Sequence, residues 1–578
     1  MTNLRITLVV ALLFTGYLLF SAWQRDYAPE QPAQTPRASQ QAGASGQEND
    51  VPSAAPERPE QAAQSTGDVP TDVAGEMPSA AETGAAQPEA PAQARPAGQR
   101  VSVETDVLRV VIGSSGGNIR EAYLKDYPVE VDQPDNPVAL MIDTPGKVFL
   151  AQSGLLGKGA KLPDHRAEFT PQRTSYALGD DDETLSVPLT WQADGVRVTK
   201  TYTFKRGSYQ VELTERVEND SGKTISVRHY RQLQRTPKEK DGGFSLTNPN
   251  RYTYFGAAVY SPEDKYVKVP FDEMEENPLG RQITGGWAAM VQHYFFAAWI
   301  PQPGEADYYY SKVHKPGGGT PRYIVGAMTP QEDVAAGASR EFSTRLYAGP
   351  MRQSKLEDVA PGLQLTVDYG IFTVLAQPLF WILSLVHGVI GNWGWAIVVV
   401  TLLIKLVFFK LTETQYKSMA KLRKVQPRMQ ALKERYGDDK QKLNQAMMEL
   451  YKTEKVNPLG GCLPLLIQIP FLIAFYWVLL ESVELRQAPW MLWIQDLSSP
   501  DPFYILPAIM GASMLLQQWL TPSPTTDPMQ RRMMMVLPLV FTVMFAFFQS
   551  GLVLYWTTNN LLSLAQQWFI TKRMEAQG

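Results

Sequence analysis

The pattern of hydrophobic and polar positions changes several times along the chain, and it begins with a continuous apolar run. The run NLRITLVVALLFTGYLLFSAW carries one charge, Arg5, and its ~20 residues are enough to cross a bilayer as one helix. Ser21-Ala22-Trp23 is a poor cleavage site for a signal peptidase. Residues 1–25 are therefore expected to form an uncleaved signal-anchor helix, with a cleaved signal peptide as the alternative.

The second pattern has almost no large apolar residues. Residues 26–100 are rich in Ala, Pro, Gln, Glu and Gly. Such a segment cannot bury enough apolar surface to offset the entropy of its chain, so a disordered linker is expected.

The third pattern is a period-2 alternation of polar and apolar positions between residues 101 and 350. It is clear in VSVETDVLRVVI, GVRVTKTYTF and SYQVELTERVE, and Gly, Asn and Asp separate these runs. Alternation with turn residues between the runs is typical of antiparallel strands. About 250 residues of this kind predict one large β-sandwich.

The last pattern is strongly apolar and extends from Ile371 to Ile570. Its first part, Ile371–Phe409, is too long for one span and breaks at HGVIGNWG (387–394). The following loop, Lys410–Lys455, holds twelve Lys/Arg and six acids, which the positive-inside rule places in the cytoplasm.

An external β domain and an internal loop must be joined by an odd number of spans. We therefore predict one span over Trp393–Thr412, and a helix that lies along the outer interface over Asp368–His387.

Three further apolar stretches follow the basic loop. CLPLLIQIPFLIAFYWVLL and PFYILPAIMGASMLLQQWL each have the length of one span, and the acidic loop between them is expected outside. The stretch 533–570 is too long for one span and breaks at Gln549-Ser550-Gly551, so it is predicted to be a hairpin of two spans. The total is six spans, five of them in a bundle after the β domain.

These patterns predict an α+β membrane protein with a cytoplasmic N-terminus and a large external domain. The expected segments are the signal anchor 1–25, the linker 26–100, the β-sandwich 101–350, a linker and interfacial helix 351–391, the second transmembrane helix 392–412, a cytoplasmic helical hairpin 413–460, transmembrane helices three to six 461–571, and a cytoplasmic tail 572–578.

Composition and motifs limit the kinds of functional site that the chain can form. The single cysteine, Cys462, excludes an intrachain disulfide framework and a multi-cysteine metal site. The sequence has no Gly-rich phosphate loop, no HExxH and no GxSxG. We therefore expect no enzyme activity, no catalytic residue, no metal and no cofactor.

Lys405 is the residue that the membrane pattern does not explain. It lies about 12 residues, or roughly 18 Å, along the helix that begins at Trp393. An ionisable group at membrane depth is costly and indicates a functional site. The core spans contain no acid that could pair with it, so we predict a polar cavity that carries one fixed positive charge. Snorkelling of the amine toward water is the alternative. The uncharged polar residues of the spans are Thr401, Gln468, Gln517, Gln518, Thr542, Gln549, Thr557, Thr558, Asn559, Asn560 and Ser563.

The basic loop shows two amphipathic helical patterns, TETQYKSMAKLRKVQPRMQALKERYGDD and KQKLNQAMMELYKTEK. Gly437 is expected to end the first helix, and Asp438 or Asp439 to cap the second. The hairpin could contact ribosomal RNA or a hydrophobic nascent chain, because methionine adapts to varied partners. A solvated face near anionic lipids is the alternative. The candidate contacts are Met419, Arg423, Lys424, Arg428, Met447 and Met448.

Several segments resemble a known family, the YidC/Oxa/Alb membrane insertases. They are EKVNPLGGCLPLLIQIPFLIAFYWVL (454–479), QPLFWILSLVHGVIGNWGWAI, GDDKQKLNQAMMELYK, SVELRQAPWMLWIQDLSSPDPFYILP and SGLVLYW. The leading anchor and the β domain resemble the six-span members of bacteria with two membranes. The resemblance implies a periplasmic β-supersandwich, an inner-membrane location, and insertion of nascent membrane proteins alone or with the Sec translocon.

The resemblance also implies roles for single residues. In that family a basic residue of the first core span lines a hydrophilic groove and recruits acidic substrate tails, and Lys405 matches its position. Arginine is commoner there in six-span relatives; lysine keeps the charge but loses the fork geometry. Thr401 resembles a groove position, and Trp556 stands where relatives often have Tyr. With Lys405, the candidate groove residues are therefore Thr401, Gln468, Gln517, Trp556 and Thr557. The short tail after Lys572 implies weaker tail-mediated ribosome binding than in relatives with long basic tails, and no specific nucleic-acid sequence is expected as a partner.

Two other classes of function are alternatives. A small-solute transporter or channel would favour inverted repeats, and the sequence has no visible repeat. A periplasmic enzyme is suggested only by the likeness of the sandwich to sugar-processing supersandwich folds, and no paired carboxylates or histidine cluster support it.

Overall fold

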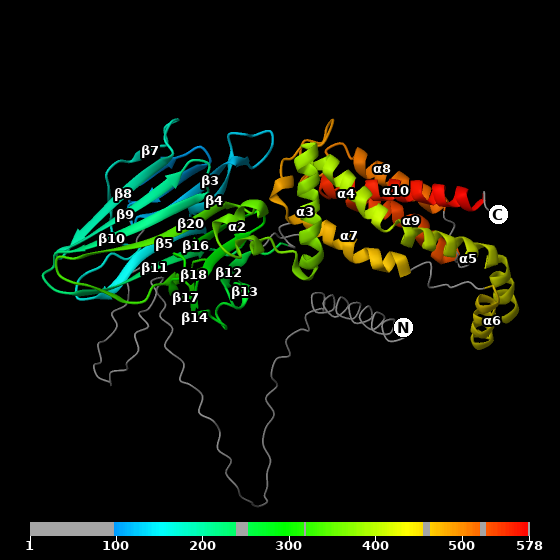
Figure 1. Ribbon diagram of the computed structural model, residues 1–578, viewed down its shortest axis with the longest axis horizontal. Coiled ribbons are helices and arrows are strands. Elements are labelled where there is room, and N and C mark those ends of the chain that lie inside the picture. Colours follow the sequence, from blue (N-terminus) through cyan, green and yellow to red (C-terminus); the bar gives the residue numbers. More distant parts are fainter. Residues whose placement is uncertain are drawn as a thin grey trace, which may run out of the picture. The chain divides into compact units, whose positions relative to one another are not determined.

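The structure is a computed structural model that describes residues 98–238, 253–316, 319–437, 439–454, 463–520 and 528–575 (Figure 1). The expected signal anchor, 1–25, and nearly all of the expected linker, 26–100, lie outside these residues.

The alternating part of the sequence forms two β-sheets, as predicted. The strand Val196–Lys205 shows why, because its even-numbered and odd-numbered residues differ regularly in burial. All strand pairs of the two sheets are antiparallel except one, since the first strand pairs in parallel with Ser175–Ala177. That exception departs from the purely antiparallel sheet that the alternation predicts.

The larger sheet has 11 strands. In spatial order they are β14 (Gly280–Thr284), β17 (Ala306–His314), β18 (Arg322–Met328), β11 (Ile225–Arg235), β5 (Lys147–Lys158), β4 (Pro137–Thr144), β3 (Asn118–Pro128), β2 (Leu108–Gly113), β1 (Arg100–Glu104) and β7 (Ser175–Ala177), with β19 (Glu332–Val334) paired to β11.

The other sheet has 9 strands. In spatial order they are β13 (Lys265–Val269), β12 (Gly256–Ser261), β15 (Trp287–Gln292), β16 (Phe295–Ile300), β20 (Ser339–Pro350), β10 (Gln210–Asn219), β9 (Val196–Lys205), β8 (Thr184–Ala193) and β6 (Thr170–Pro171).

The core of the sandwich contains a buried ion pair. Lys200 on β9 lies directly opposite Glu215 on β10, and both side chains are fully buried, with Nζ 3.2 Å from Oε1. Lys200 Nζ also donates to the carbonyl oxygens of Gly116 (2.9 Å) and Ser153 (2.8 Å). The ammonium therefore keeps a full set of acceptors away from water, as a buried charge requires.

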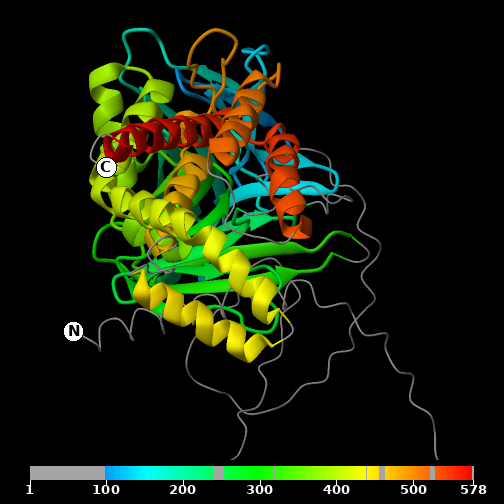
Figure 2. The same cartoon turned by 90° about the vertical axis from the view of Figure 1, so that its right-hand side faces the viewer.

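The described chain after β20 is mainly helical, with a segment of turns over 486–504 (Figure 2). The helices are α2 (Gln353–Val359), η2 (Leu363–Thr366), η3 (Gly370–Phe372), α3 (Thr373–Ile390), α4 (Trp393–Val407), α5 (Phe409–Tyr436), α6 (Lys440–Thr453), α7 (Leu463–Glu481), η5 (Val483–Leu485), α8 (Ile505–Leu520), α9 (Pro528–Phe545) and α10 (Ser550–Glu575).

Two of the predicted helix breaks are confirmed. α3 ends at Ile390 with Gly391 in the left-handed conformation, and the side chain of Asn392 caps α4 by accepting from Trp395 N. The other break separates α9 from α10, where Ser550 Oγ donates to the carbonyl oxygen of Ser499 (2.7 Å). The expected interfacial helix corresponds to α3. Together with η3, α3 is long and apolar enough to cross a membrane. Its length and composition therefore fit both a helix along the interface and a helix across the bilayer.

The expected single helix Trp393–Thr412 needs a correction. The structure divides it into α4 and α5, which meet at an angle of 64°. Neither Gly nor Pro marks this bend, so the sequence carries no signal for it. The ring of Phe408, at the bend, packs edge to face on Phe471 of α7 with 5.0 Å between ring centroids.

In the hairpin, α5 ends at Tyr436 before Gly437, as predicted. Asp439 caps α6 by accepting from Lys442 N at 3.0 Å, which settles the choice between the two aspartates. At the other end of the helical part, α10 continues to Glu575, beyond Lys572 where the tail was expected to begin.

Gly394→Ala is expected to destabilise the start of α4. A Cβ at Gly394 would overlap the ring of Trp490, whose carbonyl oxygen accepts from Asn392 Nδ2 at 3.1 Å. Overpacking of this kind costs about 1–3 kcal/mol, so the thermal unfolding midpoint of the full chain in detergent should fall by several degrees. Gly388→Ala in α3 is the matched control, since nothing lies within 4 Å of its Cβ. Equal midpoints for the two variants would contradict the close contact.

Candidate functional site

Lys405 is buried near the end of α4, with 8% of its surface exposed. Its Nζ donates to Ser563 Oγ on α10 at 2.7 Å. The hydroxyl of Ser563 in turn donates to the carbonyl oxygen of Asn559, one turn earlier, so it is oriented to accept from the lysine. Among the described residues Lys405 makes no ion pair. The ammonium is therefore held by a neutral partner and has no counter-charge there.

Two further contacts bring α4, α5 and α10 together at this point. Tyr416 on α5 donates its hydroxyl to the carbonyl oxygen of Ser563 at 3.4 Å. Gln566 Nε2 donates to the carbonyl oxygen of Lys405 at the same distance. Sequence reasoning missed Tyr416 and Gln566 altogether. It included Ser563 only among eleven uncharged polar residues, with no signal that favoured it over the others.

The two predicted threonines line the interior without contacting the amine. Thr401 donates to the carbonyl oxygen of Ile397 at 2.6 Å, and Thr557 donates to that of Val553 at 2.7 Å. Both are buried and bonded to their own helices, as threonine commonly is inside a helix. They make the interior more polar, but the amine of Lys405 donates its hydrogen bond to Ser563 and not to them.

The other three groove candidates lie apart from the lysine's hydrogen bonds. Gln468 on α7 donates to Thr412 Oγ1 on α5 at 3.4 Å. Trp556 packs against Phe545 of α9, with ring centroids 5.7 Å apart. Gln517 is half-buried on α8. The predicted residues thus lie on several helices, and within the described part of the chain the amine of Lys405 bonds to Ser563 rather than to any of them.

The hairpin forms a methionine-lined hollow of about 380 Å³ between α5 and α6. Met429, Met447 and Met448 are among its lining residues, and Met448 is exposed. Arg428 forms an ion pair with Glu454, and Met419 is half-buried on α5. The side chains of Arg423 and Lys424 lie outside the described part of the structure.

No group of three or more His, Cys, Asp or Glu that could hold a metal ion occurs among the described residues.

Comparison with known proteins identifies the family. Residues 100–382 match the family model "YidC periplasmic domain", and residues 385–577 match "60Kd inner membrane protein". The membrane protein insertase YidC of Nitrosococcus oceani is 46% identical over 584 residues, covering 100% of both chains. The chain belongs to the YidC family of membrane protein insertases.

Other relatives in the YidC family agree with this assignment. The proteins of Thioalkalivibrio sulfidiphilus and Methylococcus capsulatus, both described as membrane protein insertase YidC, are 45% and 46% identical over the full length of this chain. A solved structure described as an active YidC insertase with its first transmembrane domain resolved is 19% identical, covers 81% of this chain and 92% of its own, and has a TM-score of 0.36. The assignment rests on the sequence matches, and it makes this chain an inner-membrane protein of a family named for insertion and not for a chemical reaction.

Proposed function

We propose that this protein moves hydrophobic segments of nascent inner-membrane proteins from the cytoplasm into the bilayer, and that it does so through a polar groove at Lys405. Family membership supports the general activity. The observation that carries the groove is the buried ammonium of Lys405, whose hydrogen-bond partner is the neutral Ser563.

An ammonium in this position has lost much of its hydration and has gained one neutral hydrogen bond in exchange. Burying a charge without a counter-charge is costly, because attraction to a partner is what offsets desolvation. An acidic group that arrives with a substrate tail would supply that attraction. Lys405 therefore serves as a transient docking charge, with Thr401, Thr557, Gln468, Gln517 and Trp556 as the polar and aromatic surroundings of the path.

The hairpin is the proposed first contact for the substrate. The hollow lined by Met429, Met447 and Met448 offers flexible, polarisable side chains that suit varied hydrophobic segments. The basic residues of α5 and α6 are suited to the ribosome and to anionic lipid heads. Cooperation with the Sec translocon completes the proposed set of partners.

The proposed topology places the N-terminus and the hairpin in the cytoplasm and the β-sandwich in the periplasm. It follows from the basic loop Lys410–Lys455 and the parity of six spans. No covalent step and no cofactor are needed, because transfer of the apolar segment into lipid drives insertion, and the membrane potential acts on acidic tails.

The direct test is insertion by the purified full chain in proteoliposomes. A single-span substrate with an acidic N-terminal tail should become protected from external protease only when the protein is present. Empty liposomes measure spontaneous insertion, and uptake of small solutes by the same vesicles tests the transporter alternative. Insertion no faster than in empty liposomes, or solute flux without insertion, would refute the proposal.

A further inference from the structure

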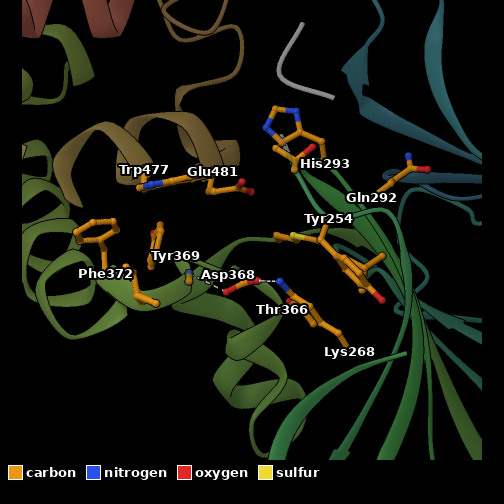
Figure 3. A pocket seen from close by; sticks show the side chains of 15 residues that line it. Tyr254, Lys268, Gln292, His293, Thr366, Asp368, Tyr369, Phe372, Trp477 and Glu481 are labelled. Carbon is orange, nitrogen blue, oxygen red and sulfur yellow. Dashed lines mark hydrogen bonds and ion pairs between the residues drawn. The ribbon is translucent and has the colours of Figure 1, made fainter. Parts of the chain in front are cut away.

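A second hollow lies where the β domain meets the helical part of the chain (Figure 3). Its volume is about 340 Å³. Tyr254 and Lys268 line it from the β domain, Asp368 from the segment before α3, and Trp477 and Glu481 from the last turns of α7. It is remote in sequence from Lys405 and takes no part in the proposed groove.

Glu481 is the unexplained group in this hollow. Its residue surface is only 7% exposed, and no hydrogen bond or ion pair to its carboxylate is found among the described residues. Figure 3 shows the carboxylate directed into the hollow. A buried carboxylate without a partner is costly, so a ligand that donates to it would be stabilised.

The other charged groups that line the hollow are already engaged. Lys268 forms an ion pair with Asp368 across the lower wall (Figure 3). His293 Nε2 lies 3.0 Å from the carbonyl oxygen of Leu480, and burial lowers the pKa of this histidine to about 4, so it is neutral at pH 7. Glu481 is therefore the acidic group of the hollow without a partner among the described residues, and burial, followed by the charge of Asp368, raises its pKa to about 8. A cationic ligand would supply the counter-charge that keeps this carboxyl ionised at pH 7.

The shape and position of the hollow select the kind of cation. The ammonium of Lys268 already lies 4.9 Å from the centroid of the Tyr254 ring, and the ring of Trp477 also lines the hollow. Aromatic side chains of this kind attract an organic ammonium. The wall formed by Ile371 and Phe372 belongs to the segment Gly370–Ile390, which is long and apolar enough to cross a membrane. Ile371 is 81% exposed, as expected of a residue that faces lipid. With α3 and α7 placed in the membrane, the hollow opens at headgroup depth, where tryptophan and tyrosine are common.

We propose that this hollow binds the headgroup of a bilayer phospholipid that carries a primary amine, with Glu481 accepting hydrogen bonds from the ammonium and Lys268 facing the phosphate. A primary ammonium has three donors for the carboxylate, whereas a choline head has none. The amino group of Lys268 is partly exposed, so it can meet a phosphate while Asp368 remains its neighbour. The proposal rests on the membrane placement of α3 and α7 and is independent of insertion itself.

Native mass spectrometry of the full chain in detergent tests the site. The protein is titrated separately with palmitoyl-oleoyl phosphatidylethanolamine, phosphatidylcholine and phosphatidylglycerol. We expect tighter retention of the ethanolamine lipid, and about a tenfold loss of that affinity in Glu481→Gln, since a charge-assisted hydrogen bond of this kind corresponds to about one decade in affinity. The matched control is Glu357→Gln, which makes the same change at an exposed position of α2.

Stability separates loss of the site from loss of the fold. Glutamine has the size of glutamate and replaces a buried acid that has no hydrogen-bond partner among the described residues, so the thermal midpoint of lipid-free Glu481→Gln at pH 7 should not fall below that of the wild type. Lys268→Met is a second test of the site. It should lower the affinity for all three phosphate-bearing lipids by a similar factor and leave the preference for ethanolamine over choline unchanged.

Three results would overturn the assignment. Equal affinity of the wild type for the three lipids would show that the hollow does not recognise the ammonium group. An unchanged preference of Glu481→Gln for the ethanolamine lipid would show that Glu481 does not bind the ammonium. Binding of free phosphoethanolamine as tightly as the lipid would show a soluble amine as the ligand. None of these results depends on insertion activity, so a failure here is distinct from a failure of the proposed function.

Discussion

Lys405→Glu is expected to reduce insertion of a substrate with an acidic N-terminal tail by at least about tenfold, while Lys405→Arg keeps most of the activity. The wild-type ammonium lies at the meeting point of α4, α5 and α10 with only Ser563 as its hydrogen-bond partner among the described residues. A charge-assisted hydrogen bond contributes about 1.5–3 kcal/mol, which corresponds to roughly one to two decades in a binding constant. Glutamate reverses the attraction into repulsion, whereas arginine keeps the positive charge.

The measurement is the initial rate of protease protection in proteoliposomes with equal amounts of each variant. Lys405→Met removes the charge but keeps an apolar stem of similar length, so its loss of rate reports the charge rather than a cavity. Lys410→Glu is the control for a general change in surface charge, since the side chain of Lys410 is 90% exposed at the start of α5.

The charge of the substrate tail gives the decisive comparison. A substrate with a neutral tail should insert at similar rates with the wild type and with Lys405→Met, because no ion pair can form in either case. If Lys405→Met inserts the acidic-tail substrate as fast as the wild type, Lys405 is a snorkelling residue, and the groove works through shape and hydration alone.

The sequence predicted the helix boundaries best where the backbone chemistry is local. The break before α4 carries Gly391 and Asn392, and the break before α10 carries Ser550, which bonds the chain outside its own helix. Turn and cap residues of this kind act through neighbouring atoms, so one sequence is enough to locate them. The bend at Phe408 depends on packing against Phe471, which is remote in sequence, and no local residue type marks it.

The same distinction explains the candidate site. That Lys405 is exceptional follows from its apolar neighbours, and the structure indeed places it in the interior. Its partner does not follow, because Ser563 is 158 positions away and resembles ten other polar residues until the helices are packed. The methionine-lined hollow could be predicted in part. Helical periodicity places Met447 on one face of α6, but it does not identify the residues of α5 that pack opposite that face.

The alternating region also carries a signal for a buried charge pair. The inward positions of β9 are Val196, Val198, Lys200, Tyr202 and Phe204, so period-2 reading alone puts a lysine in the core of the sandwich. Glu215 occupies an inward position of β10 by the same reading. Two opposite charges on the buried faces of neighbouring strands indicate a buried ion pair, and the register places them directly opposite each other.

Removing one partner of this pair should destabilise the β domain strongly. Glu215→Gln leaves the fully buried ammonium of Lys200 without its counter-charge. Lys200→Met leaves the carboxylate of Glu215 with only His229, whose Nε2 is 3.5 Å away, as a basic neighbour. Breaking a buried pair in this way costs about 3–5 kcal/mol, which for a domain of this size lowers the unfolding midpoint by roughly 10 °C. Thermal unfolding of the full chain in detergent, followed by protease susceptibility of the β domain, measures the change.

The controls use both the surface and the double variant. Glu218→Gln on the same strand removes a partly exposed carboxylate whose oxygen is 3.4 Å from Arg216, and it should change the midpoint by only a degree or two. Replacing both buried partners, Lys200→Met with Glu215→Leu, should recover much of the loss, because no unpaired charge remains. Single variants as stable as Glu218→Gln would contradict the buried pair.

The pH dependence of the unfolding midpoint tests the same ion pair in the wild-type protein, without a substitution at Lys200. Burial alone raises the pKa of Glu215, but the charges of Lys200 and His229 and the hydrogen bond from Ser153 outweigh it and lower the pKa from 4.5 to about 2. A carboxyl whose pKa is depressed on folding contributes stability above its unfolded pKa, and this contribution is lost as the pH falls through the folded value. The wild-type midpoint should therefore fall between pH 4.5 and about 2 more steeply than that of Glu215→Gln, which has no proton to gain. Parallel curves for the two proteins over this range would mean that the carboxyl of Glu215 is not held ionised by Lys200.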